Sequence, residues 1–324
     1  MATVPTVSGE IDAADLGVTL MHEHVFVLNP EMQAQRDDWR EDERKADALA
    51  KLDALKARGV DTIVDPTVIG LGRFLPRIVE LGAQTDLRIV AATGIYTYGD
   101  LPFWFHYRLP DAGAGRRDPM VDFFVQDIEE GIAGTGVRAG ILKCATDEQG
   151  LTPGVERVLR AVAQASLATG CPITTHTHAG SRRGLDQQRV FREEGVDLQR
   201  VVIGHSGDST DLDYLMELMD AGSVLGMDRF GIDAILDFES RVATVASLCE
   251  RGYADRMVLS HDAACFIDFF DPDLTATREA IMPNWHYTHI HDDVLPALLA
   301  KGVTQAQIDQ MLVTNPRRVL SGGG

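Results

Sequence analysis

The stretch TLMHEHVFV, residues 19–27, has the composition of a buried β-strand, and the chain after it continues without a glycine-rich loop. An open, doubly wound sheet normally carries a phosphate-binding glycine loop after its first strand, and MHEHVFVLNPE (21–31) has none. The stretch also contains His22 and His24, and a histidine is costly to bury without a partner. The missing loop favours a closed barrel over the doubly wound sheet, which is the alternative fold, and the two histidines either are structural or bind something.

Apolar runs rich in Val, Ile and Leu recur along the rest of the chain and lack the alternation of half-exposed strands. Continuous runs of this kind are typical of parallel strands that are covered on both faces. The predicted strands are 18–24, 60–66, 88–94, 139–145, 172–178, 200–205, 223–229 and 256–262.

Amphipathic segments separate these strands. GVERVLRAVAQA (154–165) places its apolar residues on one helical face, and Thr152 precedes it as a predicted N-cap. Other predicted helices are 120–134, 184–195, 210–221, 238–251 and 304–316, the last ending at a proline. Strands that alternate with helices predict an α/β fold, a (β/α)8 TIM barrel. The long segments 99–119 and 263–292 then lie as loops at the C-terminal face, where they form the active site.

The whole chain, 1–324, is predicted to be one barrel domain, with an N-terminal segment at about 1–16 and a frayed tail at 321–324. Its 30 basic and 49 acidic side chains give a net charge of −19. Such a surface repels phosphate backbones and anionic lipids, which argues against nucleic acid or membrane as a partner. A small, weakly charged substrate is expected instead.

Four irregularly spaced cysteines without a CxxC pair are typical of reduced thiols in a cytoplasmic protein. The N-terminus lacks the basic and apolar regions of a secretory signal, and no apolar run approaches the roughly 20 residues of a membrane span. The predicted location is therefore cytoplasmic.

Residues able to bind metal ions fall at or near the C-terminal ends of five predicted strands. A lone buried histidine is usually a core residue with a hydrogen-bond partner, so the joint pattern carries the prediction. In a barrel those strand ends converge, which predicts a metal site. Glu23 faces away from its two histidine neighbours and is expected to be structural. The candidate ligands are His22, His24, Lys143, His176, His205 and Asp262.

Lys143 lies in the apolar stretch GILKCAT (140–146). Burial and positive neighbours lower the pKa of a lysine and favour its neutral amine. A neutral amine can react with carbon dioxide to form a carbamate, whose two oxygens can bridge two metal ions. The alternative is a lysine that extends its ammonium to the barrel rim, and the apolar surroundings favour it less.

Several motifs resemble the phosphotriesterase family of the amidohydrolase superfamily: HEH, GILKCA, TTHTHAG, VVIGHSGDSTD and LSHD. The resemblance covers nearly the whole chain and includes VDPTVIGLGR (64–73) and NPRRVL (315–320). GIYTY (94–98) and GMDRFG (226–231) make the chain most similar to phosphotriesterase-like lactonases, closest to actinobacterial N-acyl-homoserine lactonases.

The resemblance implies two divalent metal ions. In it, His22, His24 and Asp262 bind the more buried ion, and His176 and His205 bind the more exposed one. N6-carboxylated Lys143 bridges both. Zinc is expected, and iron, cobalt or manganese suit the same ligands.

The resemblance also implies that Tyr96 and Arg229 contact a lactone and act in catalysis together with Asp262. The full predicted substrate-binding set is Tyr96, Tyr98, Arg229, Cys265, Phe266 and Phe269. This chain departs from close relatives at Ala263 and Ala264, where a bulkier or thiol residue often follows the aspartate. These small residues leave more room at the mouth of the barrel, so the preferred length of the acyl chain stays open.

The implied activity is that of a quorum-quenching lactonase. A metal-bridging hydroxide would open the lactone ring of N-acyl-homoserine lactones, with weak phosphotriesterase (aryldialkylphosphatase) activity beside it. A homodimer is likewise implied. Two alternatives stay open: a primary organophosphate phosphotriesterase, and a non-catalytic metal-binding barrel.

Overall fold

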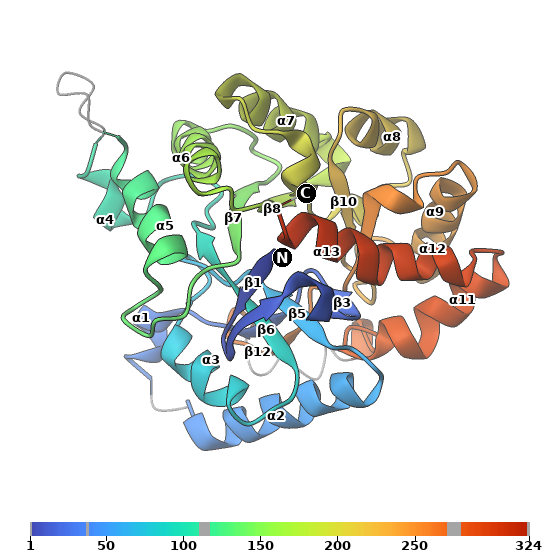
Figure 1. Ribbon diagram of the computed structural model, residues 1–324, viewed down its shortest axis with the longest axis horizontal. Helices are drawn as coiled ribbons and strands as arrows, with labels where there is room; N and C mark the ends of the chain where they lie inside the picture. The colour runs from blue at the N-terminus through green and yellow to red at the C-terminus, as the bar shows by residue number, and fades with distance from the viewer. Residues whose placement is uncertain (1, 37–38, 110–116, 271–279, 323–324) are drawn as a thin grey trace.

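The computed structural model describes residues 2–36, 39–109, 117–270 and 280–322, and its centre is a nearly closed barrel of parallel strands surrounded by helices (Figure 1). One eight-stranded sheet has the order β11-β10-β9-β8-β7-β6-β5-β3. Its strands are β3 (Thr19–Leu20), β5 (Thr62–Asp65), β6 (Arg88–Gly94), β7 (Ile141–Thr146), β8 (Ile173–Thr177), β9 (Val201–Ile203), β10 (Val224–Met227) and β11 (Met257–Leu259). The predicted (β/α)8 barrel is confirmed.

The first and last strands of the barrel are each interrupted. Beyond the break, β4 (His24–Val27) pairs in parallel with β12 (Ala264–Ile267), so each predicted terminal strand is shorter than expected. Both breaks fall at the same level of the barrel, and the residues inside them bond to one another: the His22 N–H donates to Ser260 Oγ at 2.8 Å. We call residues 21–24 together with 260–264 the seam, because they close the barrel where the sheet order ends.

Helices cover the outside of the barrel in chain order (Figure 1). The side chain of Thr152 caps the sixth of them as predicted, and Gly170 ends it in the left-handed conformation with φ 75°. The helices are α1 (Pro30–Gln33), α2 (Glu41–Ala57), α3 (Leu75–Gly82), α4 (Phe103–His106), α5 (Pro119–Glu129), α6 (Pro153–Thr169), α7 (Arg183–Glu194), α8 (Leu212–Asp220), α9 (Phe238–Glu250), α11 (Leu295–Ala300), α12 (Gln305–Asp309) and α13 (Asn315–Leu320).

The predicted helix 304–316 does not end at its proline. A π-helical turn, η8 (Gln310–Thr314), joins α12 to α13, and Pro316 occupies the first turn of α13. Proline has no N–H to donate, and the wider turn before it accommodates the missing hydrogen bond. A second such turn, η7 (Ile290–Val294), precedes α11. Short 3₁₀ turns are η1 (Ala13–Leu16), η2 (Ala179–Ser181), η3 (Leu198–Arg200), η4 (Ser206–Asp208) and η5 (Ala254–Arg256).

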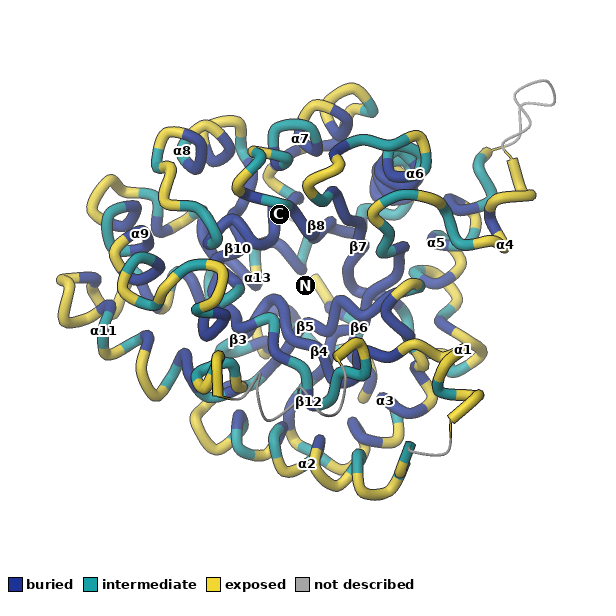
Figure 2. The backbone as a smooth tube through the Cα atoms, turned by 180° about the vertical axis from the view of Figure 1, so that it is seen from behind, coloured by how far each residue is buried: buried dark blue, intermediate teal, exposed yellow. Residues whose placement is uncertain are grey.

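The barrel strands are buried on both faces, which explains their continuous apolar runs (Figure 2). Ile63 and Ile89 belong to one large apolar cluster, whereas their neighbours Val64 and Val90 belong to a second, smaller one. The smaller cluster also takes in Val4 from the N-terminal hairpin. Among the helices of the described residues, none is both long and apolar enough to cross a membrane.

The predicted N-terminal segment forms an antiparallel hairpin, β1 (Thr3–Thr6) with β2 (Gly9–Asp12), followed by η1. The Val7 N–H after β1 donates to the Ile89 carbonyl of β6 at 2.9 Å, so the hairpin is attached to the barrel. Of the predicted frayed tail, Ser321 and Gly322 still bond to the last helix, and 323–324 lie outside the described residues. Parts of the two long loop segments, 110–116 and 271–279, lie outside them as well.

Candidate metal centre

The seam brings three predicted ligands together. His22 Nε2 lies 3.3 Å and His24 Nε2 3.2 Å from the same oxygen, Asp262 Oδ1. A tetrahedral zinc ion with bonds of about 2.0–2.2 Å holds neighbouring ligand atoms roughly 3.4 Å apart. These three residues therefore have the spacing of a metal site, and one ligand atom from each lies within 4.8 Å of the others.

The remaining predicted ligands lie next to this group. His205 Nε2 is 3.8 Å from Asp262 Oδ2, and the rings of His176 and His205 are 4.6 Å apart. Lys143 Nζ lies 3.3 Å from His22 Nε2. All six candidates, which come from five predicted strands, thus lie close together.

Asp228 determines which ring nitrogens of two ligands face the centre. Its carboxylate oxygens lie 3.1 Å from His22 Nδ1 and 3.0 Å from His205 Nδ1. A carboxylate only accepts, so both Nδ1 atoms carry the proton and both Nε2 lone pairs point inwards. Asp228 is close enough to be a ligand itself, but its oxygens already accept these bonds and the His205 backbone N–H at 2.7 Å.

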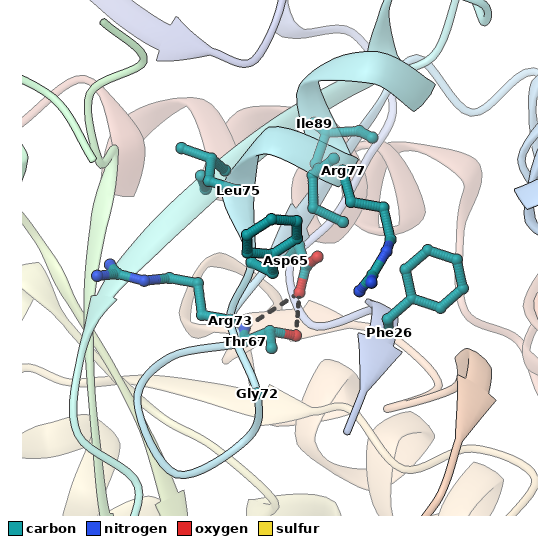
Figure 3. A pocket seen from close by; sticks show the side chains of 11 residues that line it. Phe26, Asp65, Thr67, Gly72, Arg73, Leu75, Arg77 and Ile89 are labelled. Atoms are coloured by element: carbon teal, nitrogen blue, oxygen red, sulfur yellow. Dashed lines mark hydrogen bonds between the residues drawn. The ribbon is translucent and has the colours of Figure 1, made fainter. Parts of the chain in front are cut away.

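Two side chains support His24 at Nδ1, the ring nitrogen that does not face Asp262. Its Nδ1 lies 2.7 Å from Thr67 Oγ1, which donates to Asp65 Oδ1 at 2.5 Å. Figure 3 shows Asp65 and Thr67 at a cavity of about 20 Å³ that is also lined by Phe26 and Arg77. Buried carboxylates behind histidines are typical supports of metal ligands.

The pKa of His24 differs from that of the other ligands. Burial would lower it, but the nearby carboxylates of Asp262 and Asp65 raise the pKa of His24 to about 9. A metal ion bound by His24 would therefore have to displace a proton from it at neutral pH. Burial, together with the neighbouring Lys143, lowers the pKa of His22, so this ring is neutral.

His176 is oriented by Asp147 and covered by two tyrosines. Its Nε2 lies 2.7 Å from Asp147 Oδ2, which leaves Nδ1 to face Tyr96 OH at 3.2 Å. Burial lowers the pKa of His176 to about 4 against the opposing effect of Asp147. The phenol rings of Tyr96 and Tyr98 both contact the imidazole, with ring centroids 5.3 Å from it.

Two of the ligands have strained backbones. His205 has φ 58° and Asp262 has φ 53°, both in the left-handed region that residues other than glycine seldom adopt. Each such residue costs about 1–3 kcal/mol and persists only where its surroundings hold it. Asp228 bonds the backbone N–H of His205 and so provides one such restraint.

Arg229 bonds two carboxylates, one of them from a candidate ligand. Its guanidinium is largely buried and donates to Asp262 Oδ2 at 2.9 Å and to Asp208 Oδ2 at 3.0 Å. Burial would raise the pKa of Asp262, but the hydrogen bond from His24 and the positive charge of Arg229 are among the contacts that outweigh it and hold the pKa well below its usual value. Arg229 thus acts on the Asp262 carboxylate as well as lining the cavity.

Five of the six candidate ligands line a cavity of about 360 Å³: His22, His24, Lys143, His205 and Asp262. Tyr96, Tyr98, Arg229 and Phe269 line it, as predicted for substrate-binding residues. Its apolar wall includes Ile232, Ile235, Ile267, Phe269, Phe270 and Trp285.

Cys265 and Phe266 correct the prediction, because neither lines this cavity. The Cys265 thiol is buried against Ala48 O and Tyr287 OH. Phe266 packs on Trp39, with the Arg44 guanidinium 3.8 Å from its ring centroid. Both side chains therefore pack against α2 and the residue Trp39 before it, and not against a substrate. Ala264 does line the cavity, so the small residue noted in the sequence adds space there.

The donor set suits a bound metal. Burial lowers the pKa of Lys143 to about 8, so its neutral amine is accessible near neutral pH. His22 Nε2 and Asp262 Oδ1 are both acceptors, and a cation between them would satisfy both. Sequence reasoning missed the orienting carboxylates Asp228 and Asp147, although each directly follows the C-terminal end of a strand, the region of the barrel in which Asp262 was predicted.

Comparison with known proteins identifies the family of this chain. The Phosphotriesterase family model matches residues 2–320. The phosphotriesterase homology protein of Mycobacterium tuberculosis (strain ATCC 25618 / H37Rv) is 63% identical over 326 residues, covering 100% of this chain and 99% of that protein. The aryldialkylphosphatase of Saccharolobus solfataricus is 40% identical over 318 residues, covering 96% and 97%. A solved structure, the phosphotriesterase from Mycobacterium tuberculosis, has a TM-score of 0.95 at 63% identity, covering 98% of both chains. The chain therefore belongs to the phosphotriesterase family.

Proposed function

We propose that this family member is a binuclear-metal hydrolase that opens the ring of N-acyl-homoserine lactones and hydrolyses phosphotriesters more weakly. The lining of the cavity is the observation that carries the proposal: candidate metal ligands line it together with the apolar side chains of Ile232, Ile235, Phe269 and Phe270. A lactone head group matches the polar residues, and an acyl chain matches the apolar ones.

His22, His24 and Asp262 would hold one ion, His176 and His205 the other, and carboxylated Lys143 would lie between them. Two such ions, when bound, supply a water of lowered pKa and polarise the attacked carbonyl or phosphoryl oxygen. Zinc is the proposed metal, and iron, cobalt or manganese accept the same ligands.

Asp262 and Tyr96 are the proposed proton-handling residues. Asp262 stays ionised beside Arg229, so it can accept a proton and return it to the departing alkoxide. Burial and the neighbouring Tyr98 raise the pKa of Tyr96 well above its usual value, so its phenol remains a hydrogen-bond donor. That phenol lies beside His176, where it can donate to the lactone oxygen. Arg229 fixes the Asp262 carboxylate and would orient the substrate head group.

A primary phosphotriesterase is the second candidate, because the relative named aryldialkylphosphatase is 40% identical to this chain. Comparing kcat/KM for an N-acyl-homoserine lactone with that for a dialkyl aryl phosphate separates the two. We expect the lactone to be the better substrate, and the reverse order would make phosphotriester hydrolysis the main activity. A folded protein that binds no metal and hydrolyses neither would be a non-catalytic barrel. The homodimer and the cytoplasmic location stay predictions.

A further inference from the structure

Glu23 stands between two proposed metal ligands but faces the other way. It is fully buried in the seam, where its carboxylate accepts three hydrogen bonds. The His261 backbone N–H donates to Oε1 at 2.8 Å, and the Ala263 N–H donates to Oε2 at 3.1 Å. The two backbone amides that flank Asp262 are therefore held by one side chain from the opposite end of the chain.

The third bond fixes the ring next to Asp262. His261 Nε2 accepts the Ile290 N–H at 2.9 Å, so the ring proton is on Nδ1, which lies 2.7 Å from Glu23 Oε1. All three partners of Glu23 are thus donors, which suits a carboxylate that only accepts.

Backbone bonds complete the same arrangement. The Asp262 N–H donates to His22 O at 3.1 Å, and the His24 N–H donates to Ala263 O at 2.8 Å. The left-handed backbone of Asp262 is consequently restrained on both sides. Without these restraints the residue would relax to an ordinary φ, and its carboxylate would turn away from His24 and Arg229.

We propose that Glu23 is a positioning residue that holds Asp262 in the left-handed conformation in which its carboxylate faces the metal ligands. The inference rests on the proposed role of Asp262 as a ligand. It extends the expected structural role of Glu23 to a specific contribution to metal affinity.

Glu23→Gln tests the proposal. Glutamine keeps the shape of the side chain, but its amide N–H₂ is a donor and cannot accept a hydrogen bond from a backbone N–H. Asp127→Asn is the matched control: the buried Asp127 carboxylate also accepts several hydrogen bonds, from Thr93 at 2.6 Å and from Arg73 at 2.8 Å, and none of these three residues lines the cavity. We would measure zinc affinity of the metal-free proteins by titration, and amide hydrogen exchange across 261–263. We expect Glu23→Gln to weaken zinc binding about 10- to 100-fold and to speed exchange there. Asp127→Asn should change neither.

Equal zinc affinity and equal exchange in Glu23→Gln and wild type would overturn the proposal. So would a loss of zinc affinity in Asp127→Asn as large as that in Glu23→Gln, because it would report general destabilisation. If Glu23→Gln does not fold, Glu23→Asp keeps the charge on a shorter side chain, and the same two measurements decide. A wild-type protein that binds no zinc would refute the proposed function, whereas the exchange measurement would still test the restraint itself.

Discussion

Replacing Asp228 with asparagine separates orientation of the ligands from ligation. Asparagine can still accept from His205 through its oxygen, but its amide N–H₂ then faces His22 Nδ1, now 3.1 Å from Asp228 Oδ2. His22 must move its proton to Nε2 to accept this amide, and the lone pair that faces Asp262 is lost. Loss of a partner behind a metal-binding histidine costs about 10- to 100-fold in affinity. At about 1.4 kcal/mol for each tenfold change, this is roughly 1.4–2.8 kcal/mol.

The assay is a competition titration of metal-free Asp228→Asn with zinc and a chromophoric chelator, compared with wild type and with Asp127→Asn. We expect two zinc ions to bind still, one of them more weakly. Wild-type affinity at both sites would refute the assignment of the ring protons. Complete loss of one ion would show that Asp228 is itself a ligand, which the geometry of its two oxygens argues against.

Three other perturbations test the remaining structure. Asp262→Ala should lower kcat/KM about 10²- to 10⁴-fold for both lactone and phosphotriester while circular dichroism stays unchanged, and retained lactone hydrolysis would contradict the mechanism. With a pKa of about 8, the Lys143 amine is mostly protonated at pH 7 and half neutral at pH 8. Zinc uptake should therefore be faster at pH 8 and should depend on bicarbonate, and equal uptake in carbon dioxide-free buffer would count against the carbamate. Leu52→Ala removes a fully buried side chain and should cost about 2–5 kcal/mol in urea unfolding, whereas Leu167→Ala, at a position 53% exposed, should cost about 0.5 kcal/mol or less.

The order of strands and helices was predictable because both faces of each barrel strand are buried. Continuous apolar runs such as 139–145 therefore mark parallel strands directly. The convergence of the six candidate ligands followed from topology alone, since strand ends of one barrel meet at one face. For these six residues, the type of side chain and its position near a strand end were sufficient to predict the convergence.

What the sequence did not reveal depends on contacts between distant residues. The direction of Cys265 and Phe266 is decided by packing against Ala48 and Trp39, which no periodicity in β12 encodes. The pairing of Arg229 with Asp262 depends on the turn after β10, where the backbone has left the strand. The breaks in the terminal strands were hidden for the same reason, because they accompany the pairing of β4 with β12, which lie far apart in the sequence.

The seam also has a consequence for the order of events in folding. The hydrogen bond between His22 and Ser260 joins residues 238 positions apart, so the site cannot exist until the first and last strands have met. Contacts of such long sequence separation form late, after the entropy of closing the chain has been overcome. Metal uptake can therefore be used to measure when the barrel has closed. An ion that binds only the folded protein adds its binding free energy to the free energy of unfolding. Chelation should accordingly loosen the whole barrel, starting where its two ends join.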